Sequence, residues 1–149
     1  MQQLNNIFKG VAEVALPSHS FLFERWSNAA EKIHSQSLPA VIHIIPQSVA
    51  LELNTMQTRA KNTTTCLLAF FRLCPSLDAS GEEMAEVIDM CKADAMLFLS
   101  ELIRRDRIEV QNNIRLQVTE AGYSACLAGV VMELQVLTPS ESLCSLASE

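Results

Sequence analysis

Histidines and cysteines are the side chains of this sequence best able to bind a metal or act as nucleophiles. The three histidines, at positions 19, 34 and 43, are scattered, and none has a carboxylate or cysteine at metal-ligand spacing. The five cysteines include no CxxC pair, and most lie in apolar stretches: Cys66, Cys74, Cys91, Cys126 and Cys144. The pattern predicts reduced, buried thiols in a cytoplasmic protein and no metal site, with a redox sensor at Cys91 as the alternative.

The motifs of common catalytic sites are also missing from the sequence. The four glycines form no phosphate-binding loop, and no Gly-x-Ser-x-Gly segment is present. Ser18-His19-Ser20 is typical of a helix start rather than of a catalytic pair. We therefore expect a non-enzymatic protein without a cofactor.

Composition indicates a folded chain with surplus apolar surface. Apolar residues make up 49% of the 149 residues, and the mean hydropathy of +0.19 is high for a chain with 19% charged residues. Such a surplus often ends in a subunit interface. The net charge of −6 disfavours nucleic-acid binding, which usually needs a basic face. We see neither a signal peptide nor a membrane-spanning apolar run of about 20 residues.

The first part of the chain is expected to form a helical N-terminal extension, residues 1–62, for dimerisation or partner binding. Apolar spacing predicts one helix over residues 2–15 and a second over about 18–33. The β-branched run at 40–45 favours a strand, and residues 48–60 fit either a strand or a helix. Polar residues 61–65 mark the boundary.

Helix signals dominate the second part of the chain, residues 63–137. A short helix is predicted up to Pro75, and Ser80 with Glu83 forms a capping box that opens the next one. A turn near Cys91 would separate it from a helix over 93–105. Residues 107–110 and 114–118 predict a β-hairpin, and 119–137 predict a final helix before a flexible tail, 138–149.

This order resembles a winged helix-turn-helix, most closely that of the MarR-type bacterial regulators. The matching segments are "SELIRRDRIEV" and "IRLQVTEAGYSACL". The resemblance implies a mainly α fold with a small β-hairpin, in which flanking N- and C-terminal helices build a dimer. Asp106 stands where the family usually has Gly, and Asp can adopt the left-handed conformation required there.

Two functions follow from this interpretation. The outward positions of the presumed recognition helix are apolar or acidic, whereas reading DNA bases needs polar or basic groups. Met96 and Leu97 would be either buried or an exposed patch that binds protein. We predict a regulatory protein that acts mainly through contacts with itself, as a homodimer, or with another protein, at Met96, Leu97, Val130 and Leu134. The alternative, which the resemblance implies, is a MarR-type dimeric transcriptional regulator that binds DNA through Lys92, Arg104, Arg105, Arg107 and Arg115.

Overall fold

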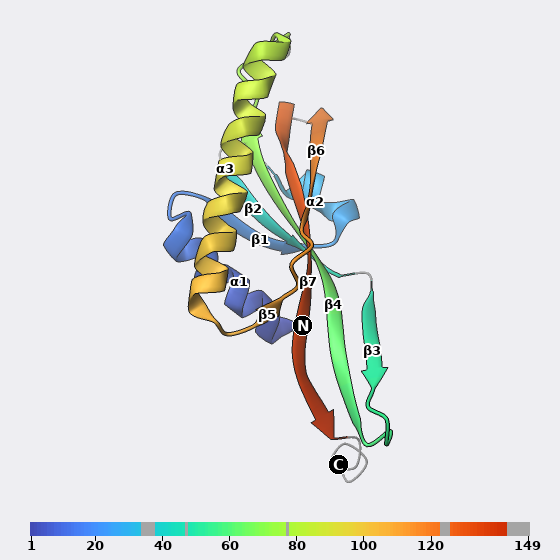
Figure 1. Cartoon of the computed structure of the whole chain (residues 1–149). Coiled ribbons are helices and arrows are strands. Elements are labelled where there is room, and N and C mark those ends of the chain that lie inside the picture. Colours follow the sequence, from blue (N-terminus) through green and yellow to red (C-terminus); the bar gives the residue numbers. More distant parts are fainter. Residues whose placement is uncertain (34–37, 47, 77, 123–125, 143–149) are drawn as a thin grey trace.

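The computed structural model describes residues 1–33, 38–46, 48–76, 78–122 and 126–142, which form a mixed seven-stranded sheet and three helices (Figure 1). The helices are α1 (Gln2–Ala15), α2 (Trp26–Lys32) and α3 (Gly81–Arg105). The strands are β1 (Ser20–Glu24), β2 (Ala40–Ile44), β3 (Val49–Leu53), β4 (Arg59–Leu73), β5 (Glu109–Val110), β6 (Arg115–Gly122) and β7 (Cys126–Ser142). The strand order is β1-β2-β4-β7-β5, with β3 beside β4 and β6 beside β7. Only the β1–β2 pair is parallel among these strands.

The two faces of the sheet bury separate apolar clusters. On one face, α1 and α3 pack against alternate residues of β4 and β7, with Phe8, Phe70 and Phe98 at the centre. On the other face, Ala29 and Ile33, at the end of α2, pack against the intervening residues. The middle of the sheet is therefore buried on both sides.

The sheet overturns the expected mainly α, winged helix-turn-helix fold. The helix predicted before Pro75 lies in β4, and the described residues of the helix predicted over 119–137 belong to β6 and β7. β4 and β7 pair antiparallel from Leu73–Leu127 to Arg59–Ser142. Strands buried on both faces carry apolar residues at consecutive positions, so their sequence imitates a helical stripe. Gly129 marks the close packing of these strands, because a Cβ there would lie 2.1 Å from the Phe70 carbonyl oxygen.

Three further predictions were wrong. Residues 81–105 form one continuous helix, α3, without a turn at Cys91. The expected hairpin is absent because β5 and β6 each pair with β7 rather than with each other. The helix expected over about 18–33 is divided into β1 and α2.

Local signals were more reliable. The helix over 2–15 and the strand near 40–45 are confirmed as α1 and β2. The capping box is confirmed, since the Glu83 N–H donates to Ser80 Oγ over 3.2 Å and the Ser80 N–H donates to Glu83 Oε1 over 3.4 Å. Asp106 ends α3 with a left-handed φ of 52°, as expected. The ambiguous segment after residue 48 contains the strand β3.

The expected division of the chain at residues 62 and 63 falls inside β4. One part of β4 pairs with β3 and another with β2, so the N-terminal strands belong to the same sheet as the later ones. The presumed tail beginning at residue 138 includes the end of β7, and residues 143–149 lie outside the described residues.

Candidate interaction surface

The outer face of α3, which we define by Met90, Met96, Leu97 and Ile103, is an exposed apolar surface. These side chains are 49%, 59%, 55% and 58% exposed, in that order. Met90 and Leu97 lie on one flank of the exposed part of α3, and Met96 and Ile103 lie on the other. Phe98 and Leu102, on the opposite part of the helix, are buried against the sheet. A surface helix normally carries polar residues on its outer side. The outer face of α3 therefore has the composition of a surface that contacts another chain.

The four predicted partner-binding residues lie in two different environments. Met96 and Leu97 are exposed on α3, so the described part of the chain does not bury them. Val130 and Leu134 belong to β7 and are buried in the core cluster under α1 and α3. Only the first two residues can contribute to an interaction surface.

Charged residues divide α3 into an acidic first half and a basic end. Glu82, Glu83, Glu86 and Asp89 all lie before the middle of the helix, whereas Arg104 and Arg105 occupy its last turn. Both arginines donate to Glu101 Oε1, Arg104 over 2.7 Å and Arg105 over 3.1 Å. These hydrogen bonds lower the pKa of Glu101 to about 2. The Arg104 side chain nevertheless remains 71% exposed.

The five residues predicted to contact DNA do not form one face. Arg105 donates to the Gly10 carbonyl oxygen over 3.0 Å as well as to Glu101, and is therefore held against α1. Arg115 lies opposite Glu133 in the β6–β7 register, on the side of the sheet away from α3. Lys92 is exposed on α3 itself, and Arg107 follows the helix. The arrangement lacks the continuous basic surface that phosphate binding requires.

A second exposed apolar surface lies on β3. Every residue of this strand is exposed, and its most exposed apolar side chain, Leu51, is 69% exposed. Met56, in the turn between β3 and β4, is 81% exposed. β3 pairs with β4 on one edge. Figure 1 shows β3 and the adjoining end of β4 extending beyond the helices. This arm carries an apolar surface outside the core.

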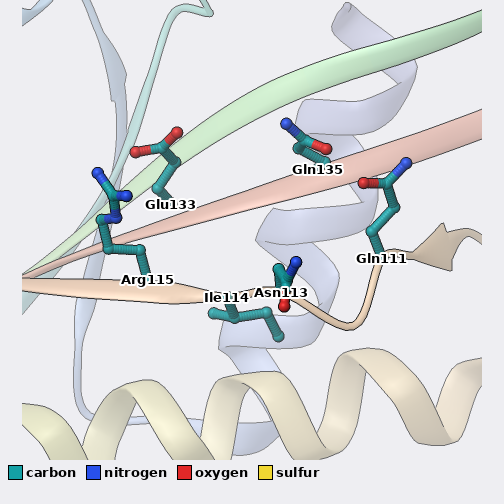
Figure 2. A pocket seen from close by; sticks show the side chains of 6 residues that line it. All are labelled: Gln111, Asn113, Ile114, Arg115, Glu133 and Gln135. Carbon is teal, nitrogen blue, oxygen red and sulfur yellow. The ribbon is translucent and has the colours of Figure 1, made fainter.

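The link between β5 and β6 forms a polar pocket of about 380 Å³ against β7 (Figure 2). It is lined by Gln111, Asn113, Ile114, Arg115, Glu133 and Gln135. The Gln111 N–H donates to the Gln135 carbonyl oxygen over 2.9 Å, which joins the link to β7. Asn113 and Arg115 are exposed, so the pocket is open to solvent. It holds no histidine or cysteine among its lining residues and has no nucleophile–base pair.

A buried ionic cluster joins α3 to the sheet. Asp94 accepts hydrogen bonds from Arg72 Nε over 2.8 Å and Nη2 over 3.0 Å, and its Oδ2 lies 3.2 Å from His19 Nε2. Burial alone would raise the pKa of Asp94, but the hydrogen bonds to His19 and Arg72 lower it overall. The cluster connects the loop before β1, the end of β4 and the middle of α3. It fixes the helix on the sheet.

His43 is a second buried histidine, and its environment keeps it neutral. Its Nδ1 lies 2.9 Å from Asn5 Oδ1, and its ring stacks on Phe23 at a centroid distance of 4.7 Å. Burial lowers the pKa of His43 to about 4. Its Nε2 has no hydrogen-bond partner in the described part of the chain. With no carboxylate or thiol in these contacts, His43 is a packing residue.

The thiols that the structure describes are buried: Cys66, Cys74 and Cys91. Burial raises the pKa of Cys66 and of Cys91 to about 12. A thiol that stays protonated is a poor nucleophile and a poor redox sensor. Cys91 lies on the inner side of α3, rather than in the predicted turn on which the sensor hypothesis rested.

Other classes of site find no support in the described residues. No group of three metal-ligating side chains occurs among them. None of their helices combines the length and apolar character that crossing a bilayer requires.

No protein-family model and no curated protein sequence matches the chain. The resemblance to MarR-type regulators thus receives no test from known families. The fold that this resemblance implied is replaced by the sheet described above.

Sequence reasoning missed the Asp94 cluster entirely. Arg72 precedes Asp94 by 22 residues and His19 precedes it by 75, so no local spacing connects them. One available signal was an acidic residue amid the apolar positions of a helix. A buried carboxylate needs a cationic partner, but the sequence does not say which cation the fold brings to it.

Proposed function

We propose that the chain is a non-catalytic protein that acts through protein–protein contacts made by the outer face of α3. The observation that carries this proposal is the exposure of Met90, Met96, Leu97 and Ile103 on a helix whose opposite side is fully packed. The exposed apolar residues of β3 add a second surface of the same kind. A cytoplasmic location fits the buried thiols.

Catalysis and DNA binding are less well supported. The two buried histidines contact an ion pair and an aromatic ring rather than a nucleophile, and two of the buried thiols have a raised pKa. The candidate DNA contacts are divided between opposite sides of the sheet, and two of them are bonded to Glu101.

Site-specific photo-crosslinking in the cells that make the protein tests this proposal. Benzoylphenylalanine replaces Met96 in one variant and Glu13 in a control, because Glu13 is exposed on α1 rather than on α3. We expect a discrete protein adduct at position 96 that is lost when Leu97→Asp is added, and none at position 13. Equal labelling at both positions, or none at either, would contradict the proposal.

A further inference from the structure

A stripe along the exposed side of α3 follows a repeat of four and three residues. Its members are Glu86, Met90, Ala93, Leu97, Ser100 and Arg104, and all six are exposed. A repeat averaging 3.5 residues keeps side chains on one line along a helix and is the spacing by which two helices pack together. We call this stripe the α3 seam.

The α3 seam is complementary to itself when read in the opposite direction. In an antiparallel pair, Glu86 meets Arg104 of a second copy, Met90 meets its Ser100, and Ala93 meets its Leu97. Each large apolar side chain then faces a small residue, and each seam end brings opposite charges together. A parallel pair would instead place Glu86 beside Glu86 and Arg104 beside Arg104.

We propose, on the basis of the function above, that the occupant of the outer face of α3 is a second copy of this chain, packed antiparallel along the α3 seam. Such a contact is two-fold symmetric, so every pairing occurs twice. Met96 borders the α3 seam and faces Met96 of the second copy across the symmetry axis. The acidic first half of each helix lies against the basic end of the other.

The geometry of Arg104 allows this pairing. Its Nε and Nη2 donate to Glu101 over 2.9 and 2.7 Å, but a guanidinium has five N–H groups, and the side chain is largely exposed. Arg104 can therefore keep Glu101 and still reach a second carboxylate. The chain carries a net charge of −6, so two copies repel each other unless cations such as Arg104 are placed against acidic groups.

Charge reversal in the purified full-length chain tests the orientation. Sedimentation velocity measures the dimer dissociation constant for the wild type, Glu86→Arg, Arg104→Glu and the double variant. Each single reversal creates two like-charge contacts and is expected to weaken the dimer roughly three- to thirtyfold. The double variant restores opposite charges and should return to within about threefold of the wild type.

Matched controls separate a specific contact from a change in net charge. Lys9→Glu and Glu13→Arg make the same charge changes on exposed residues of α1 and should leave the dimer intact. Arg104→Glu also removes the bond to Glu101, so thermal unfolding is followed by circular dichroism for each variant. Glu86 makes no such bond in the described structure. Glu86→Arg therefore still tests the antiparallel orientation if the Arg104→Glu variant does not fold.

Two results would overturn the inference: a wild-type chain that stays monomeric up to about 100 µM, or a dimer that neither reversal weakens. The crosslinking experiment distinguishes its failure from that of the proposed function. An adduct at position 96 with a different protein, from a chain that is monomeric when purified, would sustain the protein-binding function and refute self-association.

Discussion

Both faces of α3 are rich in apolar side chains, but the described chain covers only one of them. On the inner face, Phe98 packs between Phe8 and Phe70 at ring distances of 5.9 and 5.6 Å. On the outer face, Leu97 is 55% exposed. Consecutive residues of one helix thus have opposite environments. The difference shows that packing within the described chain accounts for only one of the two apolar sides of α3.

The largest expected difference between the two faces concerns Phe98 and Leu97. Phe98→Ala should lower the free energy of unfolding by about 3–5 kcal/mol, because it empties a fully buried site. Leu97→Ala, measured in dilute protein, should change it by less than about 1 kcal/mol. Urea unfolding followed by circular dichroism makes the comparison. Similar losses for both variants would show that the outer face is also part of the core.

Two carboxylates on α3, the buried Asp94 and the exposed Asp89, allow a second comparison of the inner and outer faces. Asp94→Asn should cost about 2–3 kcal/mol at neutral pH, since Arg72 and His19 lose a buried charged partner. Asp89→Asn, on the exposed side, should cost almost nothing. Urea titrations of the two variants give both values. Equal values would mean that the buried cluster does not stabilise the fold.

The same cluster predicts a dependence on pH. Folding lowers the pKa of Asp94 below its ordinary value of 3.8, so the carboxylate stabilises the fold above that pH. This contribution is lost as pH falls through the lowered pKa. The wild type should therefore lose more stability below pH 3.8 than Asp94→Asn does, and parallel acid-unfolding curves would contradict the assignment.

Ser80, the N-cap of α3, should affect the stability of the fold but not the contact made by the outer face of the helix. Ser80→Ala removes the oxygen that accepts the Glu83 N–H and should cost about 1 kcal/mol. The dimer dissociation constant should stay unchanged at temperatures well below unfolding, because Ser80 lies outside the α3 seam. A weaker dimer from a still-folded variant would extend the interface to the start of the helix.

The smallest expected difference between the two faces is in the number of thiols that react rapidly with a labelling reagent. The pKa of Cys91 near 12 keeps its thiol protonated, so Cys91→Ala should leave the number of fast-reacting thiols in the native protein unchanged. Ala93→Cys, two residues later on the exposed side, should add one fast-reacting thiol that dimer formation protects. Mass spectrometry after brief alkylation counts both. If Cys91→Ala had one rapidly alkylated thiol fewer than the wild type, Cys91 would be accessible, which would contradict the burial of the inner face of α3.

Local signals predicted α1, β2 and both ends of α3 correctly, but β4 and β7 were predicted as helices and their assembly into a sheet was not predicted. The capping box and the left-handed Asp106 depend on neighbouring residues, and both were predicted correctly. The segment "VVMELQVL" of β7 was read as a helical stripe, although Val130, Met132, Leu134 and Val136 alternate with less buried residues as a strand requires. The β-branched residues of this segment and Gly129 also favour a strand.

The candidate surface was predicted only in part. Met96 and Leu97 were identified because their side chains are unsuited to DNA, and both are exposed. Val130 and Leu134 were included because a helical stripe needs a partner surface. In the sheet, that partner is the helical layer of the same chain, so both residues are buried.

By itself, the sequence determined where α1 and α3 begin, how α3 ends, and that the chain has more apolar side chains than one core needs. These properties depend on local hydrogen bonds and on composition. Only the tertiary structure decided that β4 and β7 are central strands, that Arg72 and His19 meet Asp94, and which side of α3 is left uncovered. The physical reason is that strand pairing and buried ion pairs join residues far apart in the chain, whose proximity no local pattern encodes.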